Sequence, residues 1–247
     1  MRLLGPVLVA FLSAAVTAGA QPPQPPPPAP PAAALDAHLK GWEKAMGQLQ
    51  NFSTTFELTR KNAVFNNERK YDGSLLWMKP TNSRLAIQGR ADKADYEAFV
   101  CNAKSVFHYD GAKKTVTEFK AAPAGAGADN LLLAFLGGMT AADAKKRFQL
   151  TLKEDSKNYV TLDVRPLLAR DKQEFTHAVL ALLAPTNEGR LPAYLPYEAW
   201  KQLPNGDTEV WKLRQHKADA LNVTATLFEY EPVAGWKLQP APALPPR

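Results

Sequence analysis

The residues of this chain that could act as nucleophiles, general bases or metal ligands are few and far apart. No partner at metal-ligand spacing accompanies any of the four histidines, His38, His108, His177 and His216. The single cysteine, Cys101, lies in an apolar stretch that predicts a strand, where a lone thiol is usually a small core residue. Adjacent carboxylates such as 154–155 more often face solvent in turns than share a proton. We therefore predict a protein without catalytic residues, metal or cofactor.

The N-terminal residues have the composition of a secretory signal peptide. Arg2 is followed by an uncharged stretch that closes with the small residues Ala18, Gly19 and Ala20. A membrane span needs about 20 strongly apolar residues, and this stretch is diluted by glycine, proline and hydroxyl residues. We expect residues 1–20 to be cleaved, with an uncleaved anchor as the alternative. Position 21 is Gln and not a lipid-accepting cysteine, so we expect a periplasmic or secreted protein without a lipid anchor.

The charge of the chain is modestly basic and evenly distributed. The formal net charge is +6, and basic clusters such as 145–147 are followed soon by acidic ones such as 154–155. A nucleic-acid partner would need a continuous basic stripe, so we do not predict one. Peripheral contact with an anionic membrane surface stays open. A single cysteine cannot form an internal disulfide, so the fold must be held by its core.

Proline-rich segments at both ends delimit one domain. Residues 21–32 contain the tract QPPQPPPPAPP, which favours a stiff polyproline spacer. Residues 239–247 are again rich in proline and alanine and are predicted to be a disordered tail. The intervening residues 33–238 show no repeat and no further proline-rich joint, so we predict a single folded domain there.

Within this domain the period of the apolar residues changes from helical to alternating. Apolar residues between 33 and 49 recur at steps of three and four, which predicts a helix. The spacing of turn residues then predicts antiparallel strands over 52–58, 69–79, 83–89, 96–101, 105–109 and 114–119. Short helices are expected at 130–136 and at 141–147, the latter capped by Thr140. Further strands are expected at 147–154, 159–166, 174–183, 194–203, 208–216 and 226–230.

The segment GSLLWMKP at 73–80, the following SRLAI and the hairpin at Tyr109, Asp110 and Gly111 resemble the LolA and LolB type of bacterial lipoprotein carriers. The runs FLGGMTAADAKKRF, KEDSKNYVTLDVRP and PNGDTEVW resemble an uncharacterised family of secreted planctomycete domains. The resemblance implies an α+β fold, namely an open antiparallel β half-barrel of roughly ten to eleven strands with an N-terminal helix and a short helical lid.

The same resemblance implies a hydrophobic cavity that holds the acyl chains of a lipid or a lipoprotein. In the carrier pattern Gly73, Leu75, Trp77 and Lys79 share one face of a strand, which points into the cavity. Carriers have an arginine at the position of Lys79, and lysine lacks the planar fork with which that arginine would bind the lid. Lys79 could instead extend its charge into water at the strand end.

The predicted ligand-binding residues combine an apolar inner face with a leucine-rich lid. They are Phe56, Leu75, Trp77, Lys79, Leu85, Ile87, Phe107, Leu131, Leu132, Phe135 and Leu136. Further inner-face candidates are Phe119, Phe148, Leu150, Leu152 and Leu162.

Whether the sheet and helices leave room for a guest or close into an ordinary core is open at this stage. The function expected first is a carrier of hydrophobic ligands in the bacterial envelope, with an envelope protein as a second partner. The alternative is a scaffold module that binds protein or polysaccharide through its outer face or an edge strand, with Trp200, Trp211 and Trp236 as surface candidates.

Overall fold

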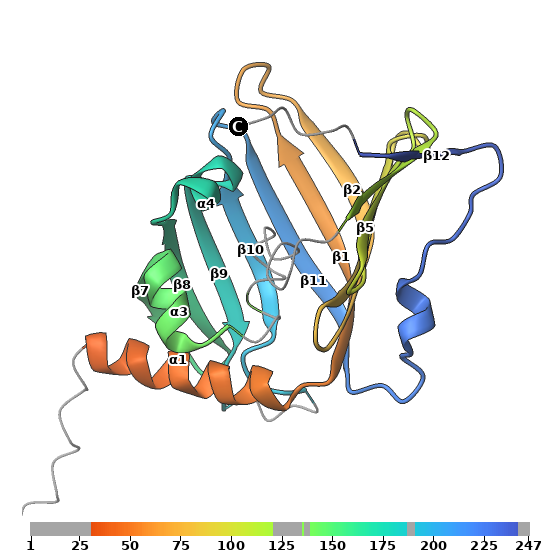
Figure 1. Ribbon diagram of the computed structural model, residues 1–247. Coiled ribbons are helices and arrows are strands. Elements are labelled where there is room, and N and C mark those ends of the chain that lie inside the picture. Colours follow the sequence, from red (N-terminus) through yellow and green to blue (C-terminus); the bar gives the residue numbers. More distant parts are fainter. Residues whose placement is uncertain (1–30, 121–134, 136–138, 187–190, 242–247) are drawn as a thin grey trace, which may run out of the picture.

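The computed structural model describes residues 31–120, 135, 139–186 and 191–241 (Figure 1). The predicted signal peptide, residues 21–30 of the predicted spacer, and the lid residues Leu131, Leu132 and Leu136 lie outside the described residues.

The chain enters the fold through helix α1 (Pro31–Gln48), which confirms the predicted helix at 33–49. Its apolar residues fall on one face because they recur at helical spacing. Leu39, Trp42 and Met46 are each almost completely buried, and Leu49 just beyond the helix continues the same stripe. Helix α1 packs mainly against strand β7 and helix α3.

All strands of the described residues belong to one sheet of 12 strands, which curves around a concave face (Figure 1). The first half contains β1 (Asn51–Lys61), β2 (Glu68–Met78), β3 (Asn82–Gly89), β4 (Tyr96–Cys101), β5 (Ser105–Asp110) and β6 (Thr115–Lys120). The second half contains β7 (Phe148–Asp155), β8 (Tyr159–Pro166), β9 (His177–Leu183), β10 (Pro196–Gln202), β11 (Thr208–Ala218) and β12 (Lys237–Pro240).

The order in the sheet is β12-β6-β5-β4-β3-β2-β1-β11-β10-β9-β8-β7. The chain therefore starts in the middle, runs outward to β6, and then returns from the opposite edge at β7 to β11, which pairs with β1. Neighbouring strands are antiparallel except β12, which pairs in parallel with β6. The open antiparallel half-barrel predicted from the sequence is confirmed, with 12 strands in place of ten or eleven.

Both faces of the sheet carry apolar side chains, and each face is covered by a different part of the chain. The concave face and α1 form the larger core. The convex face of β3–β6 forms a smaller core with the C-terminal residues Phe228, Tyr230 and Trp236. This C-terminal segment runs along the outside of the sheet, through the 3₁₀ helix η1 (Ala225–Phe228), before it reaches β12 (Figure 1).

Two short helices flank the returning strands. Helix α3 (Ala141–Arg147) has the predicted bounds, and the Asp143 amide donates to the hydroxyl of the N-cap residue Thr140 at 3.0 Å, as the cap prediction requires. Helix α4 (Ala169–Glu174) was not predicted, and the strand expected from 174 begins only at His177.

Two predictions at the C-terminal end are wrong. The strand expected at 226–230 is replaced by η1, whose residues pack on β3. Gln239 and Pro240 belong to β12 and not to a loose tail, because they pair with Thr117 and Glu118 of β6. Proline is tolerated there, since an edge strand leaves one side of its backbone without a partner strand.

Candidate functional site

The concave face of β1, β2 and β3 is an apolar wall made by alternate residues of each strand. Register places Leu75 opposite Leu85 and Gly73 opposite Ile87, so their side chains share one face. The predicted inner-face placement is confirmed for Phe56, Leu75, Trp77, Leu85 and Ile87, which are all buried. Their contact with a ligand stays a prediction.

A glycine shapes the centre of this wall. Gly73 lies opposite Phe56, and a Cβ built on Gly73 would lie 2.2 Å from Cζ of the Phe56 ring and 2.5 Å from the carbonyl oxygen of Ala86. The ring of Phe56 therefore lies directly over the glycine backbone and packs against Trp211, with ring centroids 4.8 Å apart. Only glycine permits this close approach of a ring to a neighbouring strand.

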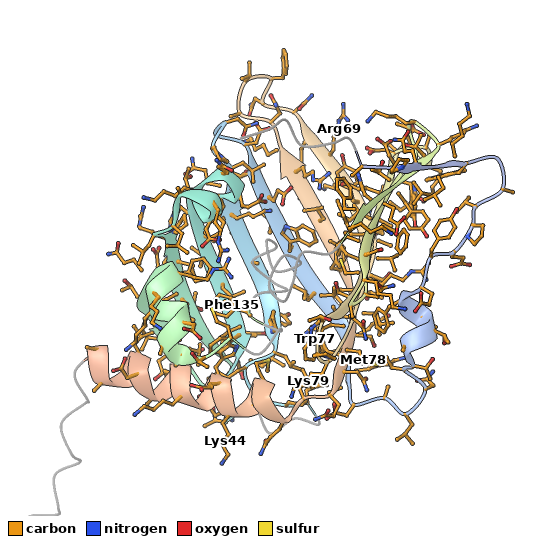
Figure 2. The ribbon with its side chains drawn as sticks, in the orientation of Figure 1. Lys44, Arg69, Trp77, Met78, Lys79 and Phe135 are labelled. Atoms are coloured by element: carbon orange, nitrogen blue, oxygen red, sulfur yellow. The ribbon has the colours of Figure 1, made fainter. Side chains whose placement is uncertain are left out.

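Phe135 is the part of the predicted lid that the structure describes. It is completely buried, and its carbonyl oxygen accepts a hydrogen bond from Nε1 of Trp42 at 3.1 Å. Its ring lies 5.1 Å from that of Trp42 and 6.2 Å from that of Phe148. Phe135 thus connects α1 to the concave side of β7 (Figure 2).

Lys79 lies at the end of β2 that meets helix α1 (Figure 2). Its Nζ donates to the carbonyl oxygen of Gly47 at 2.5 Å. The last carbonyls of a helix have no intrahelical donor and carry partial negative charge, so a lysine there stabilises the helix end. Within the described residues, Lys79 is therefore a helix cap and makes no lid contact.

The predicted inner-face placement of Phe107 is wrong. Register pairs Phe107 with Val100 and Glu118 on the convex face, where its ring packs against Tyr230 at 5.3 Å. The inner face at this point belongs to its neighbour His108, which stacks on Phe99 with centroids 4.5 Å apart. Both faces of β5 carry apolar or aromatic side chains, so alternation alone did not decide which one faces inward.

At the end of the concave face away from α1 the apolar wall gives way to charged side chains. Glu209 of β11 accepts hydrogen bonds from Nε of Arg60 at 2.9 Å and from Nε1 of Trp211 at 3.0 Å, and pairs with Nζ of Lys201 at 2.9 Å. Arg60 also lies 3.7 Å from Glu97 of β4, which pairs with His108 at 3.2 Å. We call this set the inner ion-pair chain.

The inner ion-pair chain crosses the concave face because the sheet is curved. Arg60 belongs to β1 and Glu97 to β4, and these strands are separated by β2 and β3. Burial alone would raise the pKa of the Glu209 carboxyl, but Lys201 and Arg60 hold it below its ordinary value. The hydrogen bond from His108 likewise lowers the pKa of Glu97. Both carboxyls are therefore ionised at neutral pH.

Two open hollows adjoin this charged end. One, of about 440 Å³, lies between the β1–β2 turn and the β10–β11 turn, and its lining includes Arg60, Lys61, Arg69 and Tyr71. The other, of about 680 Å³, lies between the start of β2 and the β3–β4 loop. Arg69 and Tyr71 line both hollows. Sequence reasoning missed this end of the site.

The residues considered for chemistry have structural partners. His38 pairs with Asp155 at 3.0 Å and His177 with Asp163 at 2.6 Å. Cys101 is buried, which raises the pKa of its thiol. The part of the chain that the structure describes contains no group of three or more side chains placed to bind a metal ion.

His216 is half-buried against Phe52, and this burial lowers its pKa to about 4. Its Nδ1 lies 2.9 Å from the Thr54 hydroxyl, and that hydroxyl donates to the Arg214 carbonyl oxygen at 2.6 Å. Nδ1 therefore carries the proton, and Nε2 is a buried acceptor without a partner in the described structure.

No family model and no curated protein matches the sequence. The fold does match solved structures. An uncharacterized conserved protein from Thermus thermophilus superposes with a TM-score of 0.51 at 11% identity, over 84% of this chain and 99% of its own. A LolA superfamily protein from Nitrosomonas europaea superposes with a TM-score of 0.43 at 12% identity, over 82% of this chain and 99% of its own. LprF from Mycobacterium bovis superposes with a TM-score of 0.42 at 12% identity, over 78% of this chain and 98% of its own.

The superposition on the Thermus thermophilus protein shows a shared fold, and an identity of 11% leaves the ligand undetermined. Among the described residues there is also no helix with the length and hydropathy that a membrane crossing requires. The structure therefore presents a curved open sheet with an apolar concave wall, closed at one end by α1 and charged at the other.

Proposed function

We propose that this protein is an exported, non-catalytic carrier that binds the acyl chain of a lipid or lipoprotein against the concave wall. The observation that carries the proposal is the continuity of that wall, because alternate residues of β1, β2 and β3 present apolar side chains to the concave face. In the described structure α1 and α3 pack mainly on β7 and α4 on β8, at one side of the sheet. The wall on β2 and β3 lies on the other side of β1 (Figure 1).

The dimensions of the wall suit one acyl chain. From Tyr71 to Trp77 the inner face of β2 is about 20 Å long at the usual rise of a strand. One leaflet of a bilayer contributes about 15 Å of hydrocarbon, half of a core about 30 Å thick. Phe119 extends the apolar inner face onto β6 and is 41% exposed. Burial of its exposed part by a guest chain would be favourable by about 25 cal/mol per Å².

The scaffold alternative has less support on the convex face. Of its three tryptophans, Trp211 is buried on the concave side, and Trp236 packs against Tyr96 and Tyr109 of its own chain. Trp200 contacts His177 edge to face. The apolar part of the convex face over β3–β6 is covered by the C-terminal segment, so the concave wall is the better candidate for a hydrophobic ligand.

The test measures uptake of a fluorescent fatty acid by the folded protein and by two matched variants. Leu85→Trp adds bulk on the concave wall, and we expect uptake to fall at least about fivefold because the added ring occupies space that the chain needs. The control Leu76→Trp adds the same ring on the convex side of β2 and should leave uptake unchanged.

Circular dichroism and urea midpoints establish that both variants fold. The carrier proposal is overturned if the wild type takes up no fatty acid and retains no lipid when purified from its own host. Equal loss in both tryptophan variants would place binding outside the concave wall.

A further inference from the structure

Arg69 occupies an unusual position above the concave wall. It lies near the start of β2, on the same face as Tyr71, Leu75 and Trp77, and is exposed. Figure 2 shows it at the end of the sheet remote from Trp77 and from Lys79. The inner face of β2 therefore runs from an exposed cation to buried apolar residues within a single strand.

The partner of Arg69 across the strand pair is another arginine. Register places Arg69 directly opposite Arg60 of β1. Like charges in such a pair destabilise a sheet unless counter-charges are present. Arg60 has them, because Glu209 and Glu97 both lie within ion-pair distance. The backbone of Arg69 pairs with β1, but within the described residues its guanidinium has neither an ion pair nor a hydrogen bond.

The lining of the hollow of about 440 Å³ beside Arg69 also includes Lys61, but Lys61 is opposite Glu68 in the register and projects from the other face of the sheet. Two carboxylates also line it, and both are engaged. Glu209 is held by Arg60 and Lys201. Asp207 accepts from the amide of Ala63 at 2.8 Å and from the side-chain amides of Asn62 and Asn205. The partners of Asp207 are neutral amides, so it keeps its negative charge, and on the concave face Arg69 is the cation without a described counter-charge.

We propose that Arg69 binds the phosphate of an amphiphilic ligand whose acyl chain lies along the concave wall. This inference rests on the proposed function and names the class of cargo, a phosphate-bearing lipid. An arginine fork binds two phosphate oxygens at once. A phosphate here would supply the counter-charge that Arg69 lacks. The apolar chain would begin at Tyr71, the first buried residue along β2 from Arg69.

The experiment compares three probes that divide the ligand into its parts. They are 1-palmitoyl lysophosphatidic acid, 1-palmitoylglycerol with the same chain and no phosphate, and glycerol 3-phosphate with no chain. We expect the wild type to bind the phosphate-bearing lipid about tenfold more tightly than palmitoylglycerol, the difference that a hydrogen-bonded charge makes. The advantage should shrink as salt is added, because the site is open to solvent.

Arg69→Gln should reduce this tenfold preference to less than about threefold and leave palmitoylglycerol binding unchanged. The matched control is Lys70→Gln, which removes a cation from the next residue, on the other face of β2, where Lys70 pairs with Glu68. It should keep the preference. Both substituted residues are exposed, so neither variant should lose stability.

The proposal is overturned if the wild type binds both lipids equally, or if the two variants lose the preference alike. Tight binding of glycerol 3-phosphate, equal to that of the lipid, would also overturn it and assign the site to a free phosphate ester. Failure of both lipids to bind would instead refute the carrier function itself. The binding of palmitoylglycerol thus separates failure of the head-group site from failure of the wall.

Discussion

Replacement of Glu209 by glutamine tests the inner ion-pair chain most directly. The side chain keeps its shape but loses the charge that faces both Arg60 and Lys201. Its carboxylate is 7% exposed, so water compensates little of the loss. Removing one partner of a buried ion pair usually lowers the free energy of unfolding by about 3–5 kcal/mol. The two cations are partly exposed, which reduces this effect, so we expect Glu209→Gln to lower the free energy of unfolding by about 2–3 kcal/mol at pH 7.

The assay is urea and thermal unfolding of the wild type, Glu209→Gln and the control Glu68→Gln. For a domain of this size a loss of 2–3 kcal/mol lowers Tm by about 5–10 °C. Glu68 pairs with Lys70 at 3.4 Å on the surface, so its replacement should change stability by less than about 0.5 kcal/mol. The pKa of Glu209 is lower in the folded state than in the unfolded state. Its contribution to stability is therefore fully present above the pKa of the unfolded state and is lost as the pH falls through the pKa of the folded state.

The reasoning is refuted if Glu209→Gln is as stable as the control at neutral pH. It is also refuted if 1 M salt, at which the Debye length is about 3 Å, removes the difference, because a buried pair is screened much less than an exposed one.

Two further substitutions examine the wall and its buried histidine. Gly73→Ala should lower the free energy of unfolding in urea by about 3 kcal/mol, because its Cβ would meet the Phe56 ring and the Ala86 carbonyl. Gly47→Ala has open space around it and should raise the free energy of unfolding by about 0.5–1 kcal/mol. Equal effects of the two substitutions would contradict the packing argument. His216 binds a proton more readily in the unfolded state than in the folded state, so acid should destabilise the wild type more than His216→Gln. As the pH falls from 6.5 to about 4, we expect the wild type to lose about 2 kcal/mol in free energy of unfolding relative to this variant, after allowance for the partial exposure of the side chain. A stability difference that is constant with pH would contradict this.

The local features of the fold could be predicted from the sequence because they depend on neighbouring residues. The helix at 31–48, the cap at Thr140 and most strands follow from periodicity and turn residues. The inner face of β2 was predicted from the resemblance to the carriers, in which Gly73, Leu75 and Trp77 share the face that points inward. Strand β5 carries apolar or aromatic side chains on both faces, and Phe107 was therefore assigned to the wrong face.

The inner ion-pair chain could not be predicted because strands far apart in the sequence form it. Arg60 and Glu209 are 149 residues apart and meet only through the β1–β11 pairing. A signal was nevertheless present. Arg60 continues the inward alternation of Phe56 and Leu58, so a charge occupies a position where the pattern expects an apolar residue. Such an exception at a strand end can mark the polar end of an otherwise apolar face.

The C-terminal segment explains why an apolar ligand is assigned to the concave face and not to the convex one. Val100, Phe107 and Tyr109 would leave an apolar convex surface that could aggregate or recruit partners. Phe228 is completely buried against this surface, and the Tyr109 hydroxyl donates to the Glu231 carbonyl oxygen at 3.1 Å. β12 then covers the edge of β6. The chain thus covers its own convex side from η1 to β12, and the concave wall of β1, β2 and β3 is therefore the apolar surface to which we assign the ligand.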